Sequence, residues 1–316
     1  MKKVYCIGEL LIDFVAKKQG NDLSKATDFT KKAGGAPANV AAAIAKLNGN
    51  SYFVGCVGKD PFGTFLLNTL DQGNVNTSLA QRSTTFTTLA FVSLAADGER
   101  DFVFSRGADR ELSYNSQLKE HFKNQIIHFG AATSFLGGQL EKTYSNYLQD
   151  AILNNTFICF DPNFRTDLWK GDEITFVEKC LPFIEKAHLA KFSLEEALLI
   201  SGKQDPAEAC TFLHNLGVGI ITITLGKEGT LLSTPTNQKT IPSISVKSVD
   251  TTGAGDAFIG CLLQQISKTD NPTEHQQLSF SQLEEMVMLA NKAGAITTTN
   301  YGAIESLPDQ NLLEKL

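Results

Sequence analysis

The stretch that most constrains the fold is Asp250-Thr251-Thr252-Gly253-Ala254-Gly255-Asp256. Upstream, residues 244–249 alternate apolar and polar side chains, a pattern that predicts a half-buried strand. Downstream, a mostly apolar run from Ala257 to Leu263 leads on to Ile266, which predicts a helix packed into a core. The chain is therefore expected to run from a strand through a tight glycine-rich turn into a helix.

This turn is suited to binding an anion. Gly253 and Gly255 allow backbone conformations closed to other residues, and they let a ligand approach the main chain. The first turn of a helix has unpaired N–H groups and the positive end of the helix dipole, which together attract phosphate. Asp256 lies at the same corner. It either caps the helix or accepts a proton from a substrate hydroxyl, and the turn alone leaves both interpretations open.

Composition excludes several classes of partner. The chain has 316 residues, a formal net charge of −6 and no basic run, so we expect no nucleic-acid partner. The six cysteines are scattered without a Cys-x-x-Cys pair, as in a reduced cytoplasm. Glu9 and Asp13 interrupt any signal-peptide core, and no apolar run is long enough to span a membrane. We therefore expect a cytoplasmic protein with no membrane partner.

Strand-like and helix-like segments alternate along most of the chain. This rhythm predicts an α/β fold, a mostly parallel central sheet with helices on both faces, in a single domain over residues 1–316. The expected strands are 4–8, 52–57, 125–130, 157–160, 188–192 and 220–225, with a hairpin partner at 230–233. The expected helices are 38–47, a segment ending near 70, 139–153 and 282–297.

The rhythm breaks between residues 84 and 106. Two β-like runs flank Asp97-Gly98, a strong hairpin signal. Residues 84–107, together with residues 10–32, are expected to form a small sheet that covers the site as a lid. Arg106 ends this segment, either as a substrate contact or as a surface arginine, and we favour the contact.

Polar residues recur where strands end, which is the edge at which open α/β sheets bind ligands. Asp13 follows the first strand, as a ligand contact or an ordinary loop residue, and Arg165 follows the fourth. Gly34 and Gly35 precede a small-residue helix that carries Asn39, a second candidate polar site. Elsewhere, Ser193-Leu194-Glu195-Glu196 has the pattern of a capping box.

Several nucleotide-binding and catalytic motifs are missing from the sequence. Gly58-Lys59, Gly202-Lys203 and Gly226-Lys227 lack the following Ser or Thr of a Walker A motif. No protein-kinase catalytic loop, G-x-G-x-x-G after the first strand, G-x-S-x-G elbow or zinc-type Cys/His spacing occurs. Common ATPases, protein kinases and nicotinamide dehydrogenases are therefore disfavoured.

Over nearly its whole length the chain resembles a ribokinase-like carbohydrate kinase of the phosphofructokinase-B family. Gly34-Gly35-Ala36-Pro37-Ala38-Asn39 resembles the family's N-terminal sugar motif, and residues 250–256 resemble its C-terminal motif. Residues 8–13, 97–100 and 161–165 look most like those of bacterial fructokinases.

The resemblance implies a role for each matching position. The catalytic group would be the base Asp256 with an anion hole from Gly253, Ala254 and Gly255. The sugar and the transferred group would contact Asp13, Gly34, Gly35, Asn39, Arg106 and Arg165. The nucleotide would contact Lys191, Ser193, Thr224, Gly226, Gly229 and Asn291. Glu196 would bind Mg²⁺ through water. The monovalent-cation loop would comprise Asp250, Thr252, Thr297, Asn300, Gly302 and Ser306.

At Ser193 the sequence departs from the family pattern, which has Asn there, and this leaves the direct role of Ser193 open. The implied reaction is in-line transfer of the γ-phosphoryl group of ATP to D-fructose, with Mg²⁺ and K⁺ as cofactors. Such transfer needs positioning and charge stabilisation more than covalent chemistry. We also expect a homodimer formed through the lid. The alternatives are a 2-keto-3-deoxygluconate kinase or other sugar kinase of the family, and a non-catalytic sugar-sensing relative.

Overall fold

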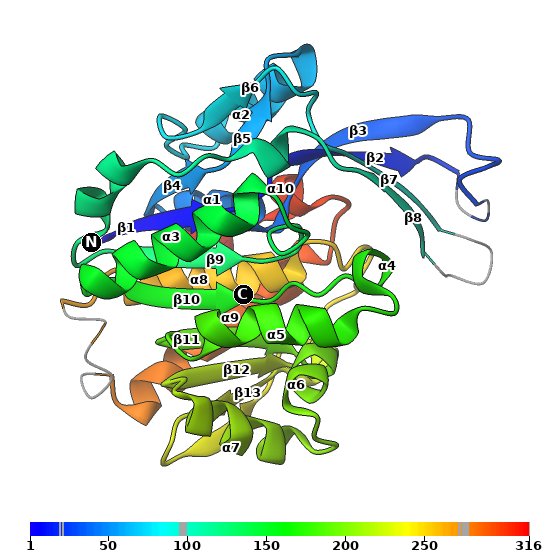
Figure 1. Cartoon of the computed structure of the whole chain (residues 1–316). Helices are drawn as coiled ribbons and strands as arrows, with labels where there is room; N and C mark the ends of the chain where they lie inside the picture. Colours follow the sequence, from blue (N-terminus) through cyan, green and yellow to red (C-terminus); the bar gives the residue numbers. More distant parts are fainter. Residues whose placement is uncertain (19, 21, 95–99, 271–272, 274–277, 316) are drawn as a thin grey trace.

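An eight-stranded sheet is the central element of the computed structural model, which describes all residues except 19, 21, 95–99, 271–272, 274–277 and 316 (Figure 1). Its strand order is β14-β13-β12-β11-β10-β9-β1-β4. Only the β12–β13 and β13–β14 pairs are antiparallel, so the predicted mostly parallel sheet is confirmed. The strands are β1 (Lys3–Ile7), β4 (Asn50–Val54), β9 (Ile126–Gly130), β10 (Phe157–Asp161), β11 (Leu189–Ser193), β12 (Ile220–Thr224), β13 (Thr230–Ser233) and β14 (Gln238–Ile241).

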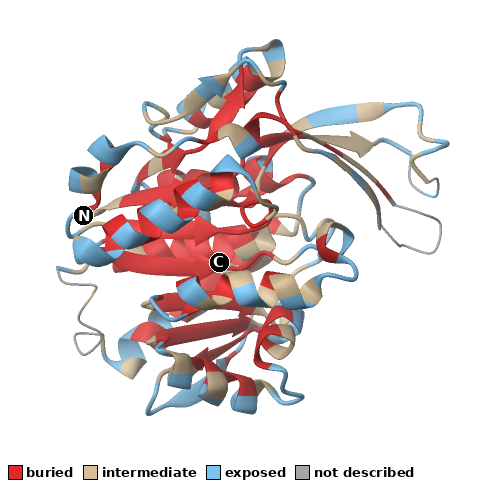
Figure 2. Cartoon of the chain, viewed as in Figure 1, coloured by how far each residue is buried: buried red, intermediate tan, exposed pale blue. Residues whose placement is uncertain are grey.

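Helices cover both faces of this sheet, and its strands are buried between them (Figure 2). In β1, Val4 and Cys6 pack toward one set of helices, whereas Tyr5 and Ile7 pack toward the other. Such continuous apolar strands are typical of parallel sheets. The first set is α1 (Ala36–Lys46), α2 (Pro61–Gln72), α8 (Ala254–Ile266), α9 (Phe280–Thr297), α10 (Ala303–Ser306) and α11 (Gln310–Lys315). The second set is α3 (Gln139–Leu153), α4 (Thr166–Trp169), α5 (Glu173–Ile184), α6 (Leu194–Ser201) and α7 (Pro206–Leu216).

A second sheet of four strands, in the order β3-β2-β7-β8, extends beyond the carboxyl ends of the central strands (Figure 1). It contains β2 (Leu11–Ala16), β3 (Phe29–Gly34), β7 (Leu89–Leu94) and β8 (Arg100–Ser105). These strands come from the two regions predicted to form a small sheet, although β3 continues to Gly34. The Asp97-Gly98 turn lies outside the described residues.

Two strand predictions are wrong. Residues 244–249 form no strand, because Pro242 follows β14 without an N–H to continue the ladder. The expected strand 52–57 is two strands, β4 and β5 (Cys56–Gly58), and β5 pairs with β6 (Gln81–Ser83) in a separate sheet. The chain bends at Gly55, where a Cβ would lie 2.4 Å from the carbonyl oxygen of Gly8.

Short 3₁₀ helices complete the chain: η1 (Ala108–Glu111), η2 (Ser116–Phe122) and η3 (Gly226–Glu228). Within the part of the chain that the structure describes, every helix is too short or too polar to cross a membrane.

Candidate active site

The start of α8 is open. Its N-cap is Gly253, with φ 79°, and no side chain caps this helix within the described part of the chain. A Cβ on Gly253 would lie 2.7 Å from Cβ of Ala303, so both the conformation and the contact require glycine. The N–H groups of the first turn therefore remain available to an anion.

Asp256 is the third residue of α8, not its cap, so the capping interpretation is wrong. Its side chain is buried, and its Oδ2 accepts a hydrogen bond from Nδ2 of Asn39 at 2.8 Å. Burial raises the pKa of Asp256, whereas the Asn39 hydrogen bond and the Lys191 ammonium oppose the rise. A carboxyl group with a raised pKa beside an open helix start has the properties of a general base.

Lys191, in β11, provides a buried positive charge next to this helix start. Its ammonium lies 3.1 Å from Oδ2 and 3.3 Å from Oδ1 of Asp161. A Cβ on Gly255 would lie 3.1 Å from the same Nζ, so the ammonium contacts the first turn of α8. Burial disfavours the charged lysine, but Asp161, Glu196 and Asp256 outweigh it and raise the pKa of Lys191. The site thus keeps a fixed cation beside the predicted anion hole.

Asp13 lies inside β2, paired with Lys32 of β3, and not in a loop as its position in the sequence had suggested. A Cβ on Gly34 would lie 2.0 Å from Oδ2 of Asp13, which explains the first glycine of the pair. Burial raises the pKa of Asp13 to about 7, against the opposing charge of Arg165; Asp256 is among the carboxylates that add to the rise. Asp13 of β2 and Asp256 of α8 therefore belong to one electrostatic cluster.

Glu9 belongs to this cluster but was not among the predicted site residues. Its side chain is buried, and its Oε1 accepts a hydrogen bond from the backbone N–H of Ala36 at 3.1 Å. Gly35, the N-cap of α1, has φ 108° and provides no side-chain cap, so Glu9 caps this helix from another element. Burial raises the pKa of Glu9 to about 7.

The two predicted arginine contacts differ. Arg106 donates to the carbonyl oxygens of Leu136 (2.9 Å) and Thr133 (3.0 Å) and lies 3.4 Å from Asp109. The Arg106 guanidinium is therefore already bound to backbone carbonyl oxygens of the protein itself. Arg165 instead donates to Oδ1 of Asn163 at 3.0 Å and acts electrostatically on Asp13 and Asp256. Of the two, Arg165 is thus the arginine that the structure brings together with the acidic cluster.

The predicted nucleotide residues lie further along the same edge of the sheet. Ser193 and Glu196 form the predicted capping box of α6, and Oε1 of Glu196 also accepts from the N–H of Phe164 at 2.8 Å. Thr224 ends β12, Gly226 begins η3 with φ 60°, and Gly229 follows η3 with φ 107°. Asn291 of α9 is bonded at both ends of its amide, to Thr230 at 2.6 Å and to the carbonyl of Ile241 at 2.9 Å.

Asp250 organises the predicted cation loop. Its Oδ1 accepts from the N–H of Thr252 and its Oδ2 from the N–H of Gly302, both at 3.0 Å.

The Ser306 hydroxyl is buried and has no hydrogen-bond partner within the described part of the chain. Thr297 donates its hydroxyl to Ala293 at 2.9 Å, and Asn300 is exposed with a bond to Thr299 at 3.3 Å. This region thus contains a carboxylate and hydroxyl oxygens, the kind of ligand that hard cations prefer.

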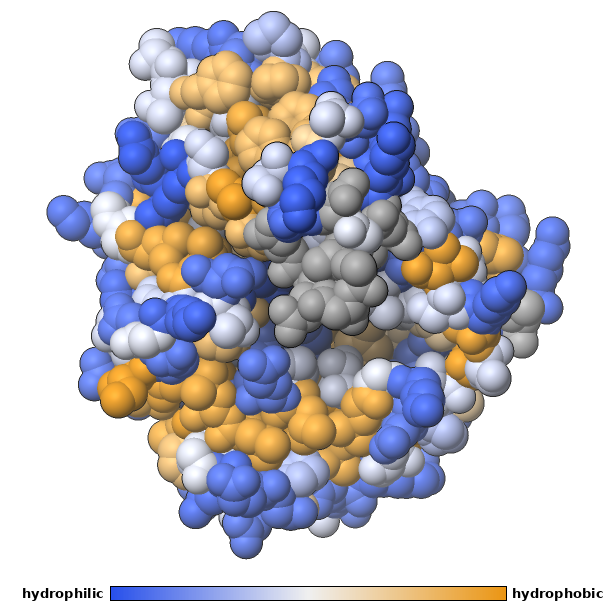
Figure 3. Space-filling view, turned by 90° about the vertical axis from the view of Figure 1, so that its right-hand side faces the viewer, coloured by the Kyte–Doolittle hydropathy of each residue, from blue (hydrophilic) through white to orange (hydrophobic). Residues whose placement is uncertain are grey.

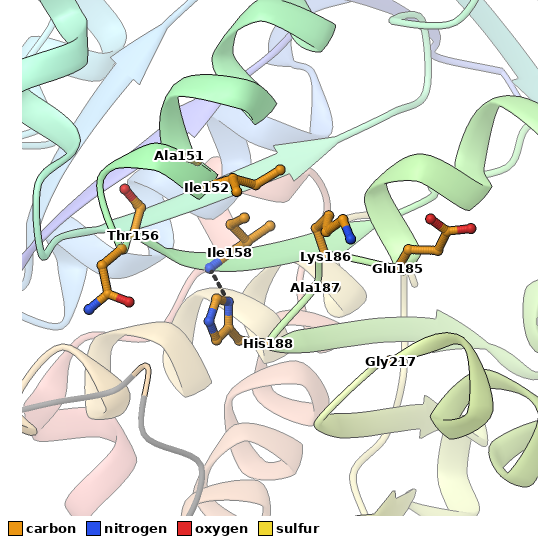
Figure 4. Close-up of a pocket in the computed structure, with 10 residues that line it drawn as sticks. Ala151, Ile152, Thr156, Ile158, Glu185, Lys186, Ala187, His188 and Gly217 are labelled. Carbon is orange, nitrogen blue, oxygen red and sulfur yellow. Dashed lines mark hydrogen bonds between the residues drawn. The ribbon is translucent and has the colours of Figure 1, made fainter.

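Figure 3 faces the carboxyl edge of the sheet and shows a hollow near the middle of this surface. A separate cavity of about 310 Å³ opens where β10 and β11 begin, at the opposite edge. There Nδ1 of His188 accepts from the N–H of Ile158 at 3.0 Å, with Ile152 and Lys186 nearby (Figure 4). None of the predicted site residues lines this cavity.

Comparison with known proteins decides the family. Residues 1–310 match the pfkB family carbohydrate kinase. The chain belongs to this family. Among curated relatives of this pfkB-family kinase, Fructokinase-1 of Oryza sativa subsp. japonica is 36% identical over 321 residues, covering 99% of this chain and 97% of the relative.

Solved structures agree with the assignment to the pfkB family. Fructokinase with bound ATP from Xylella fastidiosa has a TM-score of 0.87 at 28% identity, covering 99% of this chain and 97% of that one. Fructokinase from Vibrio cholerae O395, with fructose, ADP and calcium ion bound, has a TM-score of 0.84 at 29% identity, covering 100% and 98%. The ribokinase-like fold predicted for this chain is thereby confirmed.

Proposed function

We propose that this pfkB-family kinase phosphorylates D-fructose at its 6-hydroxyl, with ATP as donor and Asp256 as general base. One observation carries the proposal: a buried carboxylate lies at the uncapped start of α8 in a chain 36% identical to a fructokinase over its full length. An intact base also disfavours the alternative of a non-catalytic sugar sensor.

The described residues account for each step. Asp13 and Asn39 orient sugar hydroxyls, and Asp256 takes the proton as the hydroxyl oxygen attacks the γ-phosphorus. The N–H groups at Gly253–Gly255 and the Lys191 ammonium stabilise the charge that spreads over the transferred phosphoryl group. Arg165 screens the acidic cluster and would contact the transferred phosphoryl group. Exclusion of water by the four-stranded sheet, acting as a lid, prevents hydrolysis of ATP.

The nucleotide and its metal fit the remaining residues. Both oxygens of Glu196 accept one backbone N–H each, which leaves further lone pairs for a water ligand of Mg²⁺. Mg²⁺ is typically held by phosphates and one or two carboxylates, and when bound it neutralises phosphate charge.

For K⁺, the buried hydroxyl of Ser306 and the loop around Asp250 offer oxygen ligands beside the anion hole. A bound monovalent cation there would stabilise the loop without touching the sugar. We therefore expect faster turnover in potassium buffer than in sodium or tetramethylammonium buffer, and equal rates in all three would contradict this role.

We further propose that the protein is a homodimer through the lid. Phe14, Phe29 and Phe91 pack together on one face of the four-stranded sheet, and Val103 of the same sheet is 52% exposed. Apolar patches of this kind mark interaction surfaces. Light scattering should give twice the chain mass, and Val103→Asp should halve it. A monomeric wild type would contradict the proposal.

A coupled assay of ADP release over a sugar panel tests the substrate. D-fructose should give the highest kcat/KM. The position of Arg165 near Asp13 favours an acidic sugar, because a guanidinium pairs better with a carboxylate than with a neutral hydroxyl. A higher kcat/KM for 2-keto-3-deoxygluconate would therefore replace fructose as the substrate while leaving the kinase chemistry unchanged.

A further inference from the structure

Helices α1 and α8 approach each other closely next to the proposed base. A Cβ on Gly260 of α8 would lie 2.6 Å from Cβ of Ala43 and 3.1 Å from the carbonyl oxygen of Val40, both on α1. Gly260 follows Asp256 by four residues, and Ala43 follows Asn39 by four, so each pair shares one helix face. The missing side chain at Gly260 thus sets the separation at which Asn39 meets Asp256.

The contact between Asn39 and Asp256 is a single buried hydrogen bond. Nδ2 of Asn39 lies 2.8 Å from Oδ2 of Asp256, and the two residues are 5% and 7% exposed. Oδ1 of Asn39 is buried and has no hydrogen-bond partner within the described part of the chain. A side-chain amide donates only through its nitrogen, so in this orientation Nδ2 of Asn39 donates to the proposed base, Asp256.

We infer that Asn39 is a positioning residue for Asp256, and that the close α1–α8 contact keeps the two side chains in register. The inference rests on the proposed function, in which Asp256 is the base. A base that is itself oriented by a third group is a recurring arrangement in enzymes. With Oδ2 held by Asn39, Oδ1 of Asp256 is the atom that takes the proton from the sugar hydroxyl.

Hydrogen bonds to neighbouring elements also fix the two ends of the α1–α8 interface. Glu9 accepts from the N–H of Ala36, one turn before Asn39, and so fixes the start of α1 to the connection that follows β1. At the other end of the interface, Nε2 of buried Gln264 on α8 donates to the carbonyl oxygen of Leu47 at 2.8 Å. Gln264 lies eight residues, about 12 Å along the helix, from Asp256.

Charged groups surround Asp256 from several elements. Lys191 of β11 and Arg165 after β10 favour its ionised form, whereas Asp161 of β10 opposes it, and Asp13 of β2 interacts with it as a like charge. From α9 the neighbour is Gly294, whose added Cβ would lie 3.0 Å from the carbonyl oxygen of Ala254. Asn39 adds a neutral donor to the ionised form, so its removal should raise the pKa of Asp256 further.

The test compares Asn39→Ala with Gln264→Ala in the full chain, with D-fructose and ATP as substrates. Both variants remove one buried amide hydrogen bond from the same interface, so both should lower the melting temperature. Only Asn39→Ala should lower kcat, by about 10- to 100-fold, a part of the about 10²–10⁴ that general-base catalysis provides. It should also move the acid limb of kcat/KM upward by about one pH unit.

A near-isosteric variant keeps the inference testable if Asn39→Ala does not fold. Asn39→Asp preserves size and Oδ1 but places a second carboxylate against Asp256, so its acid limb should lie higher still. An unchanged acid limb in either variant, or a raised KM with wild-type kcat, would overturn the inference and assign Asn39 to sugar binding alone. A wild type inactive on every sugar would overturn the proposed function itself, and this inference with it.

Discussion

Two helices start at the carboxyl edge of the central sheet, and they start in opposite ways. At α6, Oγ of Ser193 accepts from the N–H of Glu196 at 3.1 Å, and Oε2 of Glu196 accepts from the N–H of Ser193 at 2.7 Å. At α8, Gly253 provides no side chain at all. A capped start satisfies its own N–H groups, whereas an uncapped start keeps them for a ligand. The difference therefore favours the start of α8 over that of α6 as the proposed anion site.

Lys191 connects the two helix starts. It lies two residues before Ser193 in the chain, yet its ammonium contacts the first turn of α8. Strand β11, which leads into the capped helix α6, therefore also provides the buried cation that contacts the uncapped start of α8.

The largest expected effect on stability follows from Lys191→Met. It leaves Asp161 buried without its counter-charge, which should cost about 3–5 kcal/mol in free energy of unfolding. The matched control is Lys179→Met, which breaks the partly exposed ion pair with Glu141 and should cost under about 1 kcal/mol. Urea denaturation of both variants measures this, and equal losses would show that burial of the Lys191 pair is unimportant.

Glu9→Gln should change how stability depends on pH. Burial raises the pKa of Glu9 from 4.5 to about 7. The stability that protonated Glu9 contributes is therefore fully present below pH 4.5, and the wild type loses it as the pH rises to about 7. The variant lacks this loss. Its stability relative to wild type should therefore increase between these pH values, by at most roughly 3 kcal/mol. Denaturation at pH 5 and pH 8 gives the difference, and a constant difference would contradict the raised pKa.

Gly253→Ser would give the open start a residue of the type that caps α6. It should not succeed as a cap, because φ of 79° is strained for serine and its Cβ would collide with Ala303. We expect a loss of about 1–3 kcal/mol. Gly73→Ser, where φ is −81°, is the control and should cost under about 0.5 kcal/mol. A stable, fully active Gly253→Ser enzyme would mean that the open start is not needed.

Asp205→Ala gives the smallest effect. Asp205 caps α7 by accepting from the N–H groups of Ala207 (2.8 Å) and Glu208 (3.0 Å). Loss of a cap of this kind costs about 1 kcal/mol, and kcat should be unchanged. A fall in kcat would show that helix capping alone affects turnover and would weaken the contrast between α6 and α8.

Local patterns predicted much of the fold. The helix at residues 139–153 and the capping box at Ser193 and Glu196 were predicted as the structure has them, because both depend on neighbours within a few residues. The strand expected at 244–249 failed because alternation of side chains does not supply a pairing partner.

The sequence allowed candidate site residues to be named, but it did not predict how they are arranged. The hydrogen bond from Asn39 to Asp256 joins residues 217 positions apart, and the cap that Glu9 provides joins residues 27 apart. Nothing in the local sequence at either end encodes such a contact. Asp13 was expected after a strand and lies inside one, because the second sheet forms only when four distant strands meet.

The central claim is that Asp256 works as a base and not as a cap, and Asp256→Asn tests it most directly. Asn keeps the size of the side chain but cannot accept the proton. Turnover of D-fructose at saturating ATP should fall by about 10²–10⁴-fold, while the melting temperature and the Kd for ATP stay close to wild type. A variant within tenfold of wild-type kcat would contradict the account and leave the open start of α8 without a base.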